Sequence, residues 1–139
     1  MRVLARVMCV LSLIVCAGVG LASLVAPANT AGSIGLIFDG AAGRAEFMTV
    51  YGGFYLGISA YLVLALVNRR FLESALAFLA LAASGAMLAR LGAWYWLTPE
   101  GAMTQRLLIS EVAWAASGWI GWGAAWFSRI SRPDAAATR

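Results

Sequence analysis

The fold is decided by the stretch Glu46-Phe47-Met48-Thr49-Val50-Tyr51-Gly52-Gly53-Phe54-Tyr55-Leu56-Gly57. It begins with a carboxylate and opens an apolar run of roughly 20 residues, the length at which a helix crosses the hydrocarbon core of a bilayer. Glycines on a membrane helix allow a second helix to approach closely. The stretch therefore predicts a membrane helix that packs against neighbours and carries a charge at one end.

The composition of the whole chain agrees with this interpretation. Of the 139 residues, 63% are hydrophobic and 12% are charged, whereas a soluble domain is about half apolar and about a quarter charged. Four apolar runs are long enough to span a bilayer, approximately residues 7–25, 47–67, 71–97 and 107–127. We predict an all-α integral membrane protein, a single domain over residues 1–139 that forms an antiparallel four-helix bundle.

The first apolar run also resembles a secretory signal peptide, because Arg2 and Arg6 precede it and Ala26-Pro27-Ala28 follows it. At about 19 residues, however, the run is longer than the usual apolar region of a signal peptide, so a membrane helix is favoured. Cys9 and Cys16 lie seven residues apart within it. On a helix that is roughly 10 Å, too far for a disulfide, and we expect both to be packing residues.

The arginines predict how the helices are oriented. Two, Arg44 and Arg106, belong to one side of the expected bundle, and six belong to the other: Arg2, Arg6, Arg69, Arg70, Arg129 and Arg132. Short loops rich in Arg or Lys stay in the cytoplasm. Both termini are therefore predicted to be cytoplasmic.

Several kinds of chemistry are excluded by residue type. The chain has no Lys and no His, which excludes a histidine-ligated haem or zinc, a histidine general base and a lysine Schiff base. No catalytic residue and no metal site is predicted, and the cofactor, if there is one, stays unknown. The net charge of +4 does not form the basic stripe of a nucleic-acid-binding protein. The partners expected are membrane lipids, with a larger membrane complex or a homo-oligomer left open.

Three ionisable residues lie within or at the edge of apolar runs: Glu46, Arg90 and Glu111. Counted at 1.5 Å per residue, all three belong to the outer leaflet. A charge that faces lipid costs at least about 2.5–3.5 kcal/mol. We therefore expect the three side chains to turn inward and to meet one another.

The helix faces that carry these charges support the same expectation. Glu46 shares a face with Gly53 and Gly57, and Glu111 shares one with Gly118, so small residues are predicted to form the helix contacts. Tyr51 and Trp94 are expected to flank the charges. Trp94 follows Arg90 by one helical turn, within reach of a cation–π contact.

Two interpretations of the charges stay open. In one, Glu46, Arg90 and Glu111 form a structural ion-pair network that fixes the register of the helices. In the other they bind a small ligand, a lipid headgroup or a proton. Two carboxylates and one guanidinium leave one negative charge, which Arg44, a protonated carboxylate or a bound cation or polar ligand would balance.

The chain carries four motifs, namely Glu46-Phe47-x-x-x-Tyr51-Gly52-Gly53-x-x-x-Gly57, Arg90-Leu91-Gly92, Pro99-Glu100-Gly101 and Glu111. In these motifs it resembles a bacterial family of small four-helix inner-membrane proteins catalogued as a domain of unknown function. Relatives carry an arginine directly after the Glu-Phe pair, where this chain has Met48, and Arg44 could take its place. The resemblance implies a multi-pass protein of the bacterial inner (plasma) membrane and brings no known activity.

The leading hypothesis is a non-enzymatic membrane protein that binds a small amphipathic ligand or lipid in a polar pocket near its outer face. The first alternative is an accessory or assembly subunit of a larger membrane complex, which would use the glycines and the tryptophans of the last run for packing. The second alternative is a proton-coupled transporter or a membrane enzyme. Four short helices and the absence of a nucleophile–base pair argue against it.

Overall fold

The computed structural model describes residues 2–97 and 102–130, and of residues 102–104 only the backbone. Every regular element in these ranges is helical, and no strand occurs in them. In chain order the elements are α1 (Arg2–Val25), α2 (Pro27–Ser33), α3 (Gly40–Phe47), a π-helix (Met48–Phe54), α4 (Tyr55–Val67), a 3-10 turn (Arg69–Phe71), α5 (Leu72–Leu97) and α6 (Ala102–Ile130).

Each predicted apolar run lies within helical structure, but the helices are longer than the runs. Helix α1 begins at Arg2, and α6 runs from Ala102 to Ile130. The second helical rod begins at Gly40, since α3, the π-helix and α4 follow one another without a break. The predicted turn at 98–101 and the tail at 131–139, with Arg132, lie outside the described residues.

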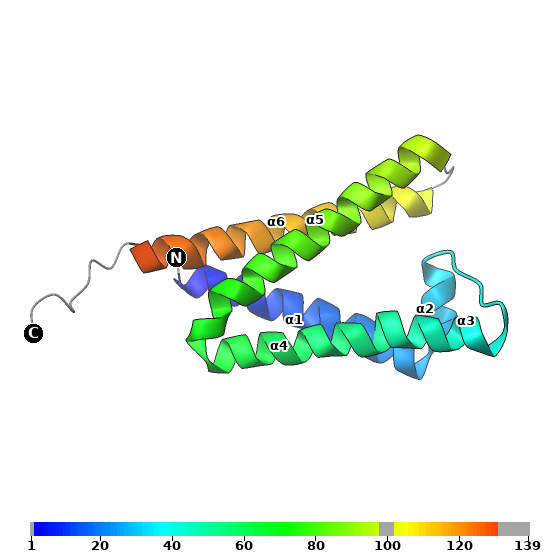
Figure 1. The fold of residues 1–139 in the computed structure, drawn as a ribbon, viewed down its shortest axis with the longest axis horizontal. Helices are drawn as coiled ribbons and strands as arrows, with labels where there is room; N and C mark the ends of the chain where they lie inside the picture. Colours follow the sequence, from blue (N-terminus) through cyan, green and yellow to red (C-terminus); the bar gives the residue numbers. More distant parts are fainter. Residues whose placement is uncertain (1, 98–101, 131–139) are drawn as a thin grey trace, which may run out of the picture.

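The helices are arranged as two side-by-side pairs (Figure 1). Helix α4 lies along α1, and α5 lies along α6, while α1 also packs against α6. The α5–α6 pair diverges from the α1–α4 pair toward the end that carries α2 and α3. The N-terminus and the last turn of α6 lie together at the opposite end (Figure 1).

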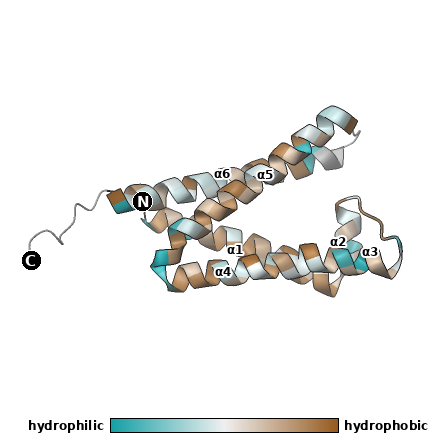
Figure 2. Ribbon diagram, viewed as in Figure 1, coloured by the Kyte–Doolittle hydropathy of each residue, from teal (hydrophilic) through white to brown (hydrophobic). Residues whose placement is uncertain are grey.

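Three stretches of helix are long and apolar enough to cross a membrane: Arg2–Val25, Gly40–Val67 and Arg69–Leu97. Large apolar side chains face outward along them, such as Ile14 at 62% exposure and Leu81 at 64%. Hydrophilic residues gather at the ends, notably between α4 and α5 and around α2 and α3 (Figure 2). Outward-facing apolar side chains on long helices indicate a membrane protein.

Helix α6, as far as the structure describes it, is long enough to cross a membrane but not apolar enough to count as a fourth such stretch. Four of its residues are tryptophans, and glycines, serines and Glu111 separate its aliphatic residues. These residues lower the mean hydropathy of the helix. The prediction of four membrane spans is therefore supported for three of them.

Small residues form the contacts between helices. The buried side of α1 consists of Ala5, Cys9, Ser12, Cys16, Gly20 and Ser23. A Cβ on Gly20 would lie 2.9 Å from Leu56 and 3.2 Å from the carbonyl oxygen of Gly52. Gly118 is tighter, because its Cβ would lie 2.7 Å from the Cα of Ala80. Close backbone approach therefore fixes both helix pairs.

The packing role predicted for Gly53 and Gly57 is wrong. Both glycines are exposed, and a Cβ on either would meet nothing within 4 Å. The residues that turn inward along this part of the rod are instead Phe47, Gly52 and Ile58, followed further along α4 by Leu62 and Ala65. The prediction took the inward face from Glu46, and the structure turns Glu46 outward.

Candidate functional site

Arg90 on α5 and Glu111 on α6 form a bidentate ion pair. The Nε and Nη2 of Arg90 donate to the two carboxylate oxygens of Glu111, each over 2.6 Å. The side chains keep 30% and 14% of their exposure, respectively. Two parallel charge-assisted hydrogen bonds hold the guanidinium and the carboxylate in one plane.

The position of this pair follows from the contact between Gly118 and Ala80. Arg90 lies ten residues after Ala80, and Glu111 lies seven residues before Gly118. Helices α5 and α6 run in opposite directions (Figure 1), so the two backbones reach roughly 15 and 10 Å beyond that contact. The long side chain of arginine spans the difference. The helix contact therefore aligns the two charges.

A stack of aromatic rings leads to the ion pair from the second helical rod. The ring centroids are 4.7 Å apart between Phe47 and Tyr51, 6.1 Å between Tyr51 and Tyr55, and 5.9 Å between Tyr55 and Trp114. Trp114 lies one turn after Glu111 on α6. The site thus combines a charged pair with an aromatic wall.

The π-helix sets the spacing of this wall. Phe47, Tyr51 and Tyr55 are four residues apart, and the wider turn of a π-helix brings such residues closer to one line than an α-helix does. The ring planes of Phe47 and Tyr51 are inclined to each other by 18°, and those of Tyr51 and Tyr55 by 9°. π-helical turns occur frequently at functional sites.

Glu46 does not join Arg90 and Glu111. Its side chain is exposed and makes no ion pair or hydrogen bond within the described part of the chain. It lines a shallow surface depression with Asp39 and Tyr51 instead. The expectation that three charges meet is therefore wrong, and the excess negative charge is not at the ion pair. Glu46 lies near the beginning of the rod, where an outward carboxylate can reach water.

Trp94 is half-buried on α5, but it makes no cation–π contact with Arg90 among the described residues. The guanidinium is held in the plane of Glu111 instead. Sequence reasoning assigned no role at this site to Trp114. The signal was present for Trp114, since its spacing of three residues from Glu111 places it beside that carboxylate on a helix.

The two cysteines are free and buried. The Cys9 thiol lies 3.8 Å from the carbonyl oxygen of Leu62, so it serves the contact between α1 and α4. Within residues 2–97 and 102–130, no group of three or more His, Cys, Asp or Glu residues is arranged to hold a metal ion. The candidate site therefore consists, among the described residues, of the Arg90–Glu111 ion pair and the aromatic rings beside it.

Comparison with known proteins adds a family to this description. No curated protein and no solved structure is significantly similar to the chain. One family profile, a domain of unknown function designated DUF4345, matches residues 4–121, which include every residue of the ion pair and the aromatic wall. The chain therefore belongs to the DUF4345 family of domains of unknown function.

Proposed function

We propose that this protein is a multi-pass protein of a bacterial inner membrane, with four spanning helices and both termini in the cytoplasm. Its three apolar stretches support membrane insertion. Helix α6 packs along α5 (Figure 1) and would cross the same layer. Arg2, Arg6, Arg69, Arg70 and Arg129 line one cavity at the end that holds the N-terminus, as the positive-inside rule requires of a cytoplasmic end.

We further propose that Arg90 and Glu111 anchor a small amphipathic ligand near the outer face. The observation that carries this proposal is the ion pair itself, which is bidentate yet partly exposed. A guanidinium has five N–H donors, and Glu111 engages Nε and Nη2. No other hydrogen bond of this guanidinium occurs among residues 2–97 and 102–130, so the remaining donors can engage an acceptor on a ligand.

The chemistry of the site indicates the kind of ligand. The ion pair is neutral as a whole, so it favours a neutral polar head with carbonyl or hydroxyl oxygens over a full anion. Tyr51, Tyr55 and Trp114 add apolar ring surface beside the pair, against which an apolar body can pack. The proposed activity is therefore binding rather than catalysis, with Arg90 and Glu111 as anchor and the aromatic rings as wall.

Native mass spectrometry in mild detergent tests this function. We expect the wild type to carry an adduct of constant small mass and Arg90→Gln to lose it while it still unfolds cooperatively. Tyr51→Leu should weaken the adduct without touching the ion pair. An adduct-free wild type, or an adduct that persists in Arg90→Gln, would contradict the proposal and leave the pair as a helix contact.

Arg106→Gln is the matched control. Arg106 is exposed on α6, so the substitution removes the same charge from a residue near Glu111 without breaking the pair. The adduct should survive it. If the wild type instead migrates with other membrane proteins and holds no small molecule, the accessory-subunit hypothesis replaces the ligand site.

A further inference from the structure

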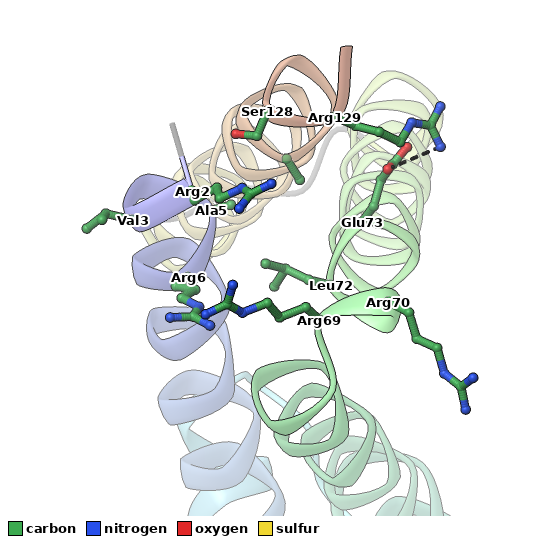
Figure 3. A pocket seen from close by; sticks show the side chains of 11 residues that line it. Arg2, Val3, Ala5, Arg6, Arg69, Arg70, Leu72, Glu73, Ser128 and Arg129 are labelled. Atoms are coloured by element: carbon green, nitrogen blue, oxygen red, sulfur yellow. Dashed lines mark ion pairs between the residues drawn. The ribbon is translucent and has the colours of Figure 1, made fainter. Parts of the chain in front are cut away.

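A cavity of about 770 Å³ lies at the end of the molecule opposite the Arg90–Glu111 pair. The beginning of α1, the 3-10 turn and first turn of α5, and the last turns of α6 surround it (Figure 3). Five arginines line it: Arg2, Arg6, Arg69, Arg70 and Arg129. The only acid among its described lining residues is Glu73.

The charges of this cavity are not balanced by the described part of the protein. Glu73 is engaged by Arg129, with 3.4 Å between Oε2 and Nη1. Neither Arg6 nor Arg69 has a carboxylate partner within residues 2–97 and 102–130. The cavity therefore has an excess of positive charge that an anion can balance.

Two of the arginines converge. In Figure 3 the side chains of Arg6 and Arg69, one from α1 and one from the 3-10 turn, point toward each other. Arg70, the next residue, points away, with its guanidinium 5.0 Å from the ring centroid of Phe71. The positive-inside rule requires arginines at this end, but it does not require two of them to converge. Like charges repel at short range, so the convergence is favourable once an anion lies between them.

The lining also favours an anion that carries an apolar part. Guanidinium groups bind phosphate by paired hydrogen bonds, and apolar residues also line the cavity, among them Val3, Leu72 and Ala125. Val3 is 75% exposed and Val7, one turn further along α1, is 44% exposed. An acyl chain can follow this flank of α1 while its headgroup stays among the arginines. Basic pockets between membrane helices on the cytoplasmic side bind anionic lipid headgroups.

We propose that this cavity binds the phosphate headgroup of an anionic phospholipid between Arg6 and Arg69. Free phosphate has the same recognition chemistry, and the apolar lining favours the lipid. The site is separate from the Arg90–Glu111 pair, so either proposal can fail without the other.

Lipid titration of the delipidated full-length protein in neutral detergent tests the proposal. Phosphatidylglycerol, phosphatidylcholine and inorganic phosphate are added separately. Native mass spectrometry detects the adducts, and thermal unfolding gives the unfolding temperature. We expect phosphatidylglycerol to bind and to raise the unfolding temperature, and Arg69→Gln to weaken its binding about tenfold by removing one charge-assisted contact. Arg6→Gln, on a different helix, should have the same effect.

Arg70→Gln is the matched control, because it removes the same charge from the same turn. Arg70 borders the cavity, but its side chain points away from the place where Arg6 and Arg69 converge (Figure 3). This variant should bind phosphatidylglycerol nearly as the wild type does. Equal losses in Arg70→Gln and Arg69→Gln would overturn the proposal in favour of diffuse attraction. Equal binding of phosphatidylcholine would overturn it as well, and equal stabilisation by inorganic phosphate would assign the cavity to a soluble phosphate compound.

The sign of the stability change gives an independent readout. Without lipid, Arg69→Gln should unfold at the same temperature as the wild type or higher, because the substitution removes repulsion from Arg6. With phosphatidylglycerol it should unfold at a lower temperature than the wild type. An Arg69→Gln variant that is less stable by the same amount in both conditions would reduce Arg69 to a structural residue and overturn the proposal.

Discussion

At the residue scale, the ion pair between Arg90 and Glu111 has the clearest energetic consequence. Glu111→Ala removes two charge-assisted hydrogen bonds from a guanidinium that is only partly exposed. We expect the free energy of unfolding to fall by about 1.5–3 kcal/mol, the range for hydrogen bonds to charged groups. Equilibrium unfolding in mild detergent measures this loss.

A double-mutant cycle separates the pair from its surroundings. Replacing both residues, as in Arg90→Met with Glu111→Leu, leaves no unpaired charge, so the double variant should recover part of the stability that each single variant loses. Strictly additive losses would show that the two side chains are not coupled.

The contact between Gly118 and Ala80 gives a second prediction at this scale. A Cβ on Gly118 would lie 2.7 Å from the backbone nitrogen and Cα of Ala80, which cannot move aside as a flexible side chain can. Gly118→Ala should therefore separate α5 from α6 and destabilise the protein by about 1–3 kcal/mol. Thermal unfolding measures the change.

Gly123 on the same helix is the control, because a Cβ there meets nothing within 4 Å. Gly123→Ala should be neutral or gain up to about 1 kcal/mol from helix propensity. A Gly118→Ala variant as stable as Gly123→Ala would show that α5 and α6 are not held by this contact.

Residue by residue, the site was predictable where a charge lies deep in an apolar run. Arg90 and Glu111 each lie well inside such a run, so the cost of facing lipid indicated that they would meet, and they lie 2.6 Å apart. The same argument misplaced Glu46, because a carboxylate near a helix end reaches water without a partner. The predicted run began at residue 47, but the helical rod begins at Gly40. Counting residues from the wrong start gave the wrong depth and direction for Glu46.

At the scale of elements, the π-helix Met48–Phe54 makes its own prediction. A π-helical turn accommodates one extra residue within an α-helix. Deleting Gly53, which is exposed and contacts nothing, should convert the segment to α-helix and keep the residues on both sides facing α1. We expect a loss of stability below about 1 kcal/mol, as for surface changes with small effects, and circular dichroism with thermal unfolding measures it.

Deleting Ala60 is the comparison, because it is exposed within the regular helix α4. That deletion turns one part of the helix by about 100° relative to the other, so Ile58 and Leu62 can no longer both face the core. It should unfold the protein or cost several times more than the deletion of Gly53. Equal costs would mean that the π-helix does not hold an extra residue.

The elements themselves differ in how far the sequence predicts them. Long apolar runs predict helices because a backbone in lipid must satisfy its own hydrogen bonds, and all four runs are helical. The π-helix has no comparable signal in the sequence, and its packing is against α1. The buried or partly buried residues of this stretch recur in pairs every four residues: Phe47 and Met48, Tyr51 and Gly52, Tyr55 and Leu56. The prediction selected Gly53 because it took the face of Glu46 to be the inward one, whereas Glu46, Gly53 and Gly57 share an exposed face.

At the scale of the whole molecule, the arginine distribution predicts the orientation. Five arginines line one cavity beside the N-terminus, whereas Arg44 and Arg106 are exposed elsewhere. Since arginine-rich ends stay in the cytoplasm, both termini should be cytoplasmic and the segment between α2 and α3 should lie outside. A fluorescent protein at the C-terminus should fluoresce, and alkaline phosphatase fused after Asp39 should be active.

The four-span topology depends on α6, because its hydropathy does not establish a span by itself. If α6 lay along the membrane surface, the C-terminus would be on the same side as the end of α5, and phosphatase fused after Ile130 would be active while the fluorescent fusion stayed dark. If α6 spans beside α5, the two reporters give the opposite result. We expect spanning, because Glu111 then meets Arg90 within the layer and each side chain relieves the other of the cost of facing lipid. Glu111→Ala should accordingly raise the fraction of molecules with an external C-terminus, and Arg106→Gln should not.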